Sequence, residues 1–518
     1  MIYSQLSQNL FNSVFIGSQS SATGYSLYRG GALYSQQGDI SLTNCSISNS
    51  SANGDGGAVY TTHNVIITNT TIIDSASKSG NGGAIYGLNV KVTNSTLSNN
   101  AANRNGGAIY AVENITIANS TFSNNTASTS NGGAMYSGND ISITNCTVSD
   151  SSAAEKGGAI YSGAGESNYT ISPNVVLSNS TFSSNTATSG GVLYTTGHYY
   201  HHAKFMDSTF IDNVAVSGGV AHVENSSLSI INSVCNNNEA SEDGGVLDMI
   251  FSSVSIRDSS LSGNNAGNNG GVFYGQNYST NFTIVHTVMD HNSAGNGGVF
   301  YVRRSNSNIE ILDAKLIRNS ANNHGGVMDI RGVTLTMDMD TVIANNTAGS
   351  SGDVISACVS QITAYGPQAR IDPVYSLYCS IYDEGSTFRP HPMSQTISTD
   401  DGTAVSTTEQ NLIGTEGDTE SVTMTVSEGG ATNEEMAPTT SFASTSQSTS
   451  AVIFTSDNPG ILRTHIPFEG TTSSPLDATS QMPSSNPTTT YVEKTSEPNT
   501  HQPPNKVTGT KTQIILHG

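Results

Sequence analysis

The sequence contains no tryptophan, and large apolar and charged side chains are scarce. Hydrophobic residues make up 35% of the 518 residues and charged residues 11%. These values lie below those of ordinary compact globular domains. No apolar run approaches the ~20 residues of a membrane-spanning helix. The segment from Met1 to Gln5 has neither a basic region nor a continuous apolar stretch, so no targeting segment is visible.

Basic residues are scarce as well. The chain has 18 Lys and Arg against 40 Asp and Glu, which gives a formal net charge of −22. Basic residues form no cluster beyond Arg303-Arg304. Proteins bind nucleic acids and anionic membrane surfaces through basic fields that displace counterions. The charge balance therefore excludes nucleic acid and an anionic membrane surface as partners.

The 5 cysteines are too few for a disulfide scaffold, and their spacing fits no metal site. Cys45 and Cys146 occupy one repeat position that is usually Ser or Thr, and we interpret them as small packing residues. Cys358 and Cys379 fall outside the repeat, and whether they form a disulfide stays open. We expect no cofactor and no metal.

Glycine is abundant, and Gly-Gly pairs recur at regular intervals along the chain. A second motif, Asn-Ser-Thr-apolar-x-x-Asn, lies between successive pairs, as in Asn119 to Asn125. It is preceded by an alternating triplet such as Ile115-Thr116-Ile117. Steps between pairs are 24 to 28 residues, except for one step of 33. Such a period is the signature of a repeat architecture. The Gly-Gly pairs begin at Gly30, Gly56, Gly82, Gly106, Gly132, Gly157, Gly190, Gly218, Gly244, Gly270, Gly297 and Gly325.

Each repeat holds three short apolar patches of period two, separated by Gly, Asn and Ser turns. This pattern predicts an all-β, right-handed parallel β-helix, a three-sheet solenoid of about 12 coils. We expect glycine at the turns to adopt positive φ, and asparagine to adopt left-handed geometry and bond to the next coil. Side chains should stack in inward ladders, although the sequence does not fix which member of each alternating set faces inward. Examples are Ala108, Tyr110, Ile115, Ile117 and Phe122.

Two regions follow from the change of composition. Residues 1–385 are predicted to form the β-helix. Residues 386–518 are rich in Ser, Thr and Pro, which predicts a disordered, mucin-like tail. The sequence opens inside a coil, at Asn12 to Ser18, so we expect that the true N-terminus and any secretion signal precede it.

The paired motifs resemble the repeats of chlamydial polymorphic membrane proteins. They stand here as Gly107-Ala108-Ile109 with Phe122 to Asn125, and as Gly133-Ala134-Met135 with Val148 to Ser151. The resemblance covers roughly residues 12–350 and implies a β-helix of the pectin-lyase-like superfamily. Members of this family are autotransported surface adhesins, so it also implies an extracellular or cell-surface location. The Thr/Pro-rich C-terminal part departs from the family pattern.

An enzyme acting on polysaccharides is the alternative function. Such β-helical sites gather two or three carboxylates on one outward face in adjacent coils. Asp248 and Asp329 take a position usually held by Tyr, but they lie three coils apart, and Asp338 and Asp340 have no ionisable neighbour one coil earlier. We therefore assign no catalytic residue and predict a non-enzymatic adhesion or structural scaffold. Its partner is a protein or glycan of a cell surface or matrix.

One cluster interrupts the regular pattern, namely His198, Tyr199, Tyr200, His201 and His202. It follows the longest coil, and we expect it to project as a loop. Three histidines so close together are compatible with a transition metal, but an aromatic-polar loop tip explains them as well. We interpret the cluster as a candidate ligand loop. Sequons in insertions, at Asn168, Asn277 and Asn281, are the better candidates for glycans, because those within the repeat are expected to be stacked turn residues.

Overall fold

The computed structural model describes residues 1–20, 29–163, 174–276, 280–338, 340–349 and 354–358, and then only short strands. The chain divides into Met1–Thr439 and Thr440–Gly518, and every described residue lies in the first unit. Cys379, the side chain of Cys358 and nearly all of the expected tail 386–518 lie outside the described residues. The late strands are β50 (Gln361–Tyr365), β51 (Tyr375–Ser376), β52 (Thr387–His391), β53 (Thr396–Ser398) and β54 (Ala404–Ser406).

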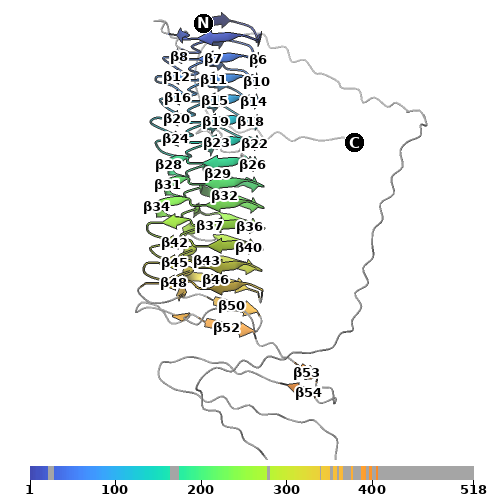
Figure 1. Ribbon diagram of the computed structural model, residues 1–518, viewed down its shortest axis with the longest axis vertical. Coiled ribbons are helices and arrows are strands. Elements are labelled where there is room, and N and C mark those ends of the chain that lie inside the picture. Colours follow the sequence, from blue (N-terminus) through green and yellow to red (C-terminus); the bar gives the residue numbers. More distant parts are fainter. Residues whose placement is uncertain are drawn as a thin grey trace, which may run out of the picture. The chain divides into compact units, whose positions relative to one another are not determined.

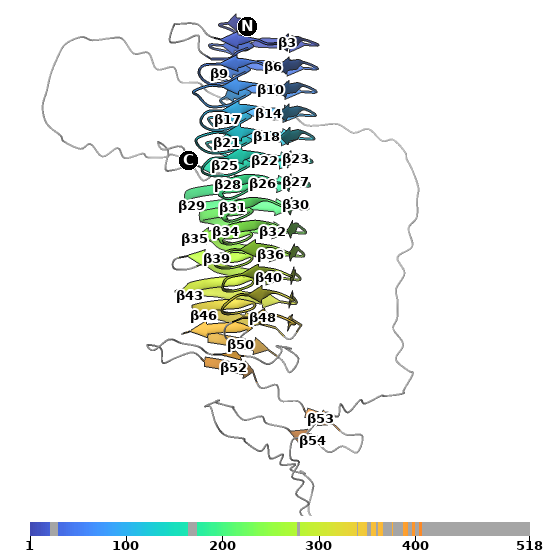
Figure 2. The same cartoon turned by 60° about the vertical axis from the view of Figure 1, so that its left-hand side comes forward.

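The structure confirms the predicted fold class, an all-β right-handed parallel β-helix with three sheets (Figures 1 and 2). Among the described residues, sheet A has 26 strands and sheets B and C have 13 each. Most coils add two strands to sheet A and one to each of the other sheets. A typical coil consists of β17 (Ile109–Ala111) and β18 (Ile115–Ala118) in sheet A, β19 (Thr121–Ser123) in sheet B and β20 (Thr126–Ala127) in sheet C.

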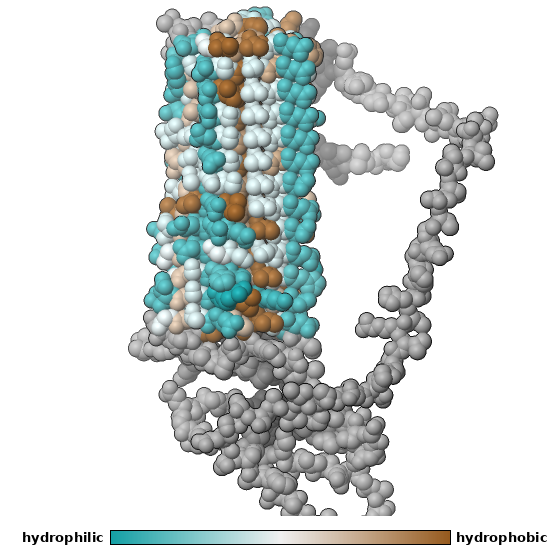
Figure 3. Space-filling model, viewed as in Figure 1, coloured by the Kyte–Doolittle hydropathy of each residue, from teal (hydrophilic) through white to brown (hydrophobic). Residues whose placement is uncertain are grey.

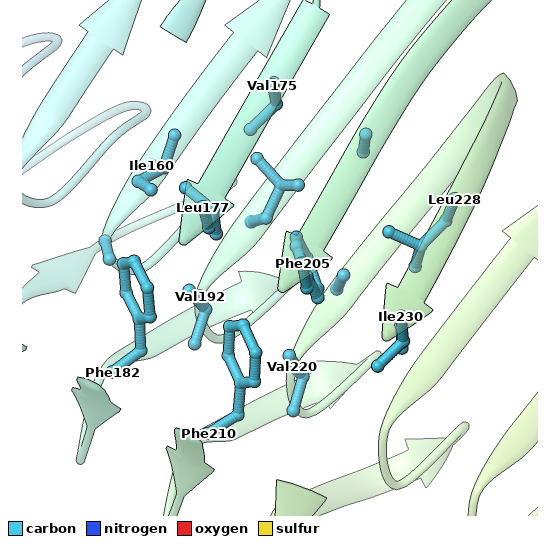
Figure 4. Packing of buried hydrophobic residues seen from close by; sticks show 14 of the residues in the cluster. Ile160, Val175, Leu177, Phe182, Val192, Phe205, Phe210, Val220, Leu228 and Ile230 are labelled. Atoms are coloured by element: carbon cyan, nitrogen blue, oxygen red, sulfur yellow. The ribbon is translucent and has the colours of Figure 1, made fainter. Parts of the chain in front are cut away.

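The coils stack in register, so that each inward position forms a ladder. Ile115 pairs with Ile141 of the next coil, and Phe122 pairs with Val148. The inward side chains form one continuous apolar core, part of which is shown in Figure 4 around Phe182 and Phe210. These two rings stack at 5.2 Å, the spacing that neighbouring parallel strands impose. A thin core of medium-sized residues suffices because each coil buries its apolar side chains against two neighbours.

Tyr110 departs from the expectation. Ala108, Ile115, Ile117 and Phe122 are buried in the core as predicted, but Tyr110 lies between buried Ile109 and Ala111 and faces outward. Successive side chains of a strand point to opposite faces. In β17, Ile109 and Ala111 face the core, so Tyr110 between them faces outward and belongs to a column on the outer face.

The glycine pair has two separate roles. The first glycine of each of the twelve pairs has φ between +61° and +68°, as predicted. The second has ordinary φ but lies against the next coil: a Cβ on Gly133 would stand 2.0 Å from the carbonyl oxygen of Gly158. The first position therefore needs glycine for its conformation and the second for close approach.

Asparagine also has two roles, at adjacent positions of one turn. Asn99 is exposed, with φ of +55°, and donates a hydrogen bond to Asp74 of the preceding coil. Asn100 is fully buried, donates its Nδ2 to the Ile72 carbonyl and contacts Asn125 Oδ1 at 3.1 Å. Asn99 combines the left-handed geometry and the bond to a neighbouring coil that the sequence predicted, whereas the buried ladder asparagine beside it was not predicted. Where this position is asparagine, the internal amide ladder satisfies backbone groups of the turn.

Some coils have a longer strand in sheet A where the two usual strands merge. In β29 (Leu193–Met206) and its neighbour β32 (Ala221–Ile231), the register shifts between Thr196 and His201. A similar shift separates Arg303 from Ser307 in the pair β43 (Phe300–Leu312) and β46 (Met328–Met337). These irregularities interrupt the outer face of sheet A next to the tyrosine column.

Candidate functional site

One outward column of sheet A collects the rings and most of the buried ionisable groups. Ring centroids of consecutive tyrosines are 4.8 to 5.5 Å apart, and their planes lie nearly parallel. The column continues through residues that replace tyrosine in later coils. In order, its members are Tyr3, Tyr34, Tyr60, Tyr86, Tyr110, Tyr136, Tyr161, Tyr194, His222, Asp248, Tyr274, Tyr301, Asp329 and Ser356.

At the end of the eight tyrosines the column becomes charged. Tyr194 stacks on the His222 ring at 4.7 Å, with 5° between the planes. The Nδ1 atom of His222 lies 2.9 Å from Oδ2 of Asp248, whose strand β35 (Leu247–Ile250) belongs to the next coil. Both side chains are over nine-tenths buried, at 9% and 5% exposure. The parallel register therefore places a ring, an imidazole and a carboxylate in consecutive coils.

A chain of hydrogen bonds joins Tyr194 to two charged neighbours. Lys156 Nζ donates to the Tyr194 hydroxyl at 3.1 Å and lies 4.3 Å from the centre of its ring. The same hydroxyl donates to Glu224 Oε2 at 3.1 Å, and Thr196 Oγ1 donates to that oxygen at 3.3 Å. The ammonium group polarises the hydroxyl and so strengthens its bond to the carboxylate. Glu224 is held in one orientation, with both donors on one oxygen.

Burial sets the protonation of several of these groups. Burial first, and then the neighbouring Glu224 carboxylate, raise the pKa of Tyr194 far above its usual value, so it stays a protonated donor. Burial raises the pKa of Asp243, and nearby Asp248 adds to the shift. Burial also raises the pKa of Asp329, which Arg303 partly offsets. The outer face of sheet A is thus partly dehydrated around its carboxylates.

Two other points along the column show a cation over a ring and beside a carboxylate. Arg29 lies 4.8 Å from the centre of the Tyr60 ring, and its Nε atom is 3.1 Å from Asp55 Oδ2. Arg303 lies at the same 4.8 Å over Tyr301, and its Nη2 atom is 2.6 Å from Asp329 Oδ2. At both points, a tyrosine ring and a carboxylate therefore bind the same guanidinium group.

Asp248 and Asp329 lie where the sequence placed them, in the tyrosine column and three coils apart. The other members of the site, His222, Glu224 and Lys156, were missed. A signal existed, because the segment Gly218 to His222 aligns with Gly190 to Tyr194, so that histidine stands in the tyrosine position. Glu224 and Lys156 had no such signal, because only the coil geometry brings them to Tyr194.

The histidine cluster lies within β29, beside this site. The register shift leaves residues 197–200 opposite only Asn225 of β32, so the strand bulges there. His201 is 1% exposed, and His202 Nδ1 lies 2.5 Å from Ser227 Oγ. The side chains of residues 198–200 lie outside the described part. The cluster thus belongs to a bulged strand in which His201 is buried and His202 is exposed, and its ligand-binding role stays a prediction.

Within the described ranges, no group of three or more His, Cys, Asp or Glu side chains is arranged to hold a metal ion. The same residues include no helix long and apolar enough to cross a membrane. Cys45, Cys146 and Cys235 are free and buried. Cys45 and Cys146 pack in the turn next to the left-handed asparagine, in the small-residue position expected from the sequence.

The Chlamydia polymorphic membrane protein (Chlamydia_PMP) repeat matches residues 94–112 and 179–196. Each matched segment runs from a left-handed asparagine, Asn94 or Asn179, through the buried ladder asparagine to a Gly-Gly pair and its tyrosine. No curated protein and no solved structure matches the chain. The chain carries repeats of the chlamydial polymorphic membrane protein type, folded as coils of a right-handed parallel β-helix.

Proposed function

We propose that this chain is an extracellular or cell-surface scaffold that adheres to a protein or glycan ligand through contacts repeated along its coils. The observation that carries the proposal is the repetition of outward side chains in register. On sheet B, threonine occupies the same outward position in six successive coils, at Thr71, Thr96, Thr121, Thr147, Thr181 and Thr209.

The outer faces suit many weak contacts. Figure 3 looks onto sheet B, where pale columns of near-neutral hydropathy run along the coils beside a hydrophilic column. Large exposed apolar side chains are concentrated in the first coil, at Leu6, Phe11, Val14 and Ile16 among others. Identical groups one coil apart, at ~4.8 Å, present equivalent contacts to a partner. Such multivalency raises avidity without any single strong site.

The alternative function, a polysaccharide-acting enzyme, has less support. Asp248 and Asp329 are three coils apart, about 14 Å at ~4.8 Å per coil, whereas paired catalytic carboxylates of glycosidases are about 5–9.5 Å apart. Each is also engaged, Asp248 by His222 and Asp329 by Arg303. An engaged carboxylate is less available as a general acid or base.

Adhesion and cleavage can be tested on the same preparation. Beads coated with the purified full chain should adhere to cells or extracellular matrix, and beads coated with an unrelated acidic protein serve as the control. Incubation with polyuronates and neutral polysaccharides should release no shorter chains. Depolymerisation that disappears when Asp248, Asp329 or Glu224 is replaced by its amide would overturn the scaffold proposal in favour of the enzyme.

A further inference from the structure

The Asp248 site repeats the strand register of the Asp329 site with two changes. In the Asp329 site, Tyr301 pairs with Asp329, and Arg303, two residues after the ring, supplies the guanidinium group. In the Asp248 site, His222 takes the position of the ring and pairs with Asp248. The residue equivalent to Arg303 is Glu224. A carboxylate therefore stands where the other site carries its own cation.

Both carboxylates of the Asp248 site lack a strong cationic partner. In the described part of the chain, Glu224 forms no ion pair, and its hydrogen bonds from Tyr194 and Thr196 both reach Oε2. Within the described ranges, the one ion-pair contact of Asp248 is with the His222 imidazole, and its Oδ1 atom is buried without a hydrogen-bond partner. A buried, unpaired carboxylate oxygen costs free energy and favours the approach of a cation.

The residues around Glu224 and Asp248 add negative charge, and Glu224 lies where a ligand can reach it. Glu224 is half-buried at the surface, with buried Asp248 on the next coil behind it. The charges of Asp248 and Glu242 both raise the pKa of Asp243, which adds to the effect of its burial. Lys156 Nζ donates to the Tyr194 hydroxyl, and among the described residues it forms no ion pair with Glu224. The bulge at residues 197–200 flanks the same face.

We propose that Tyr194, Glu224 and Asp248 form a binding face for the guanidinium group of an arginine side chain on a protein ligand. The ligand arginine supplies the cation that Arg303 supplies in the Asp329 site. Glu224 accepts its N–H groups, the hydroxyls of Tyr194 and Thr196 hold that carboxylate in orientation, and Asp248 adds attraction from behind. This inference rests on the proposed scaffold function and names the chemistry of its ligand.

The probe is a short peptide of alternating Gly and Arg, with the Gly-citrulline peptide as its uncharged isostere. Binding to the full chain is measured by calorimetry at low and at physiological salt. The arginine peptide should bind, and Glu224→Gln should weaken it about tenfold, the loss expected for one charge-assisted contact. Glu310→Gln removes an equal charge from an exposed position of β43 and should leave the affinity unchanged.

A second variant supplies a cation from the chain itself in place of the ligand arginine. Glu224→Arg places a cation in the position equivalent to Arg303 and should abolish peptide binding while the chain keeps its melting temperature. Equal affinities of the Glu224→Gln and Glu310→Gln variants, or of the arginine and citrulline peptides, would overturn the inference. So would Glu224-dependent retention of a neutral polysaccharide by a chain that does not bind the arginine peptide.

The two proposals fail separately. Beads that adhere to matrix equally well with wild-type and Glu224→Gln chains would refute the arginine site as the adhesive contact and leave the scaffold standing. Peptide binding that depends on Glu224, with beads that adhere to nothing, would support the site and refute the scaffold function.

Discussion

The two glycines of one turn should respond differently to the same small substitution. We consider Gly132 and Gly133, in the middle of the described β-helix, each replaced by Ala. At Gly132, φ is +68°, and the new Cβ would lie 2.2 Å from the Met135 carbonyl oxygen. At Gly133, the Cβ would lie 2.0 Å from the Gly158 carbonyl oxygen and 2.6 Å from the backbone of Ser152. Neither set of atoms is the end of a flexible side chain.

The structure allows the two costs to be separated. A left-handed conformation costs a residue with Cβ about 1–2 kcal/mol. Gly17 provides this term alone, since its φ is +63° and its Cβ would meet nothing within 4 Å. Gly133→Ala carries only the steric cost, because Gly133 does not have a left-handed φ. To relieve the clash, the neighbouring coils must separate, which lengthens backbone hydrogen bonds worth about 1 kcal/mol each. Gly132→Ala carries both terms, so we expect it to cost about 3 kcal/mol or more.

The assay is chemical denaturation followed by circular dichroism, with hydrogen exchange to locate the weakened coil. Solenoids unfold by cooperative neighbours, so exchange should rise first in the coils beside the substitution. Replacing both glycines by Val should lower stability by several kcal/mol. If neither Gly132→Ala nor Gly133→Ala lowers the unfolding free energy by more than Gly17→Ala does, the assigned roles of the pair are wrong.

Four further outcomes are expected. Asn213→Ala should cost about 2–4 kcal/mol by denaturation, because buried donors and acceptors of the amide ladder lose their partners; a loss under about 0.5 kcal/mol would contradict the ladder. Tyr110→Phe should keep both ring stacks and the melting temperature, whereas Tyr110→Ala should lower the unfolding free energy by about 2–3 kcal/mol. Arg318 lowers the pKa of Asp290, so the stability difference between wild type and Arg318→Ala should be present at pH 7 and vanish as pH falls below about 3.9; a difference that grows in acid would refute this. Residues 386–518 should be trimmed by limited proteolysis, as their composition predicts, and protection equal to that of the coils would contradict it.

The fold could be predicted because each coil repeats the same local rules. Gly132 marks the start of a turn, Phe122 marks a core strand, and their regular recurrence leaves few architectures open. Which residue of a strand faces inward was less certain. Tyr110 was expected in the core because it is large and partly apolar, but period-two alternation with Ile109 and Ala111 places it outside.

The candidate site could be predicted only in part. Asp248 was recognised because it breaks the tyrosine pattern, and His222 breaks it in the same way one coil earlier. Glu224 carries no such mark, since it lies in β32 two residues after the column position, where the sequence varies from coil to coil. Lys156 lies 38 residues before Tyr194 in the chain and reaches its hydroxyl only across the coil boundary.

The sequence by itself determined the repeat length, the parallel β-helix, the turn glycines and the column in which Asp248 and Asp329 lie. These features depend on local conformation and on periodicity, both of which a sequence displays directly. Only the tertiary structure decided which groups meet: Lys156 with Tyr194, Tyr194 with Glu224, and His222 with Asp248. Those contacts depend on the lateral register of stacked coils and on side-chain direction, and insertions of variable length conceal both in the linear chain.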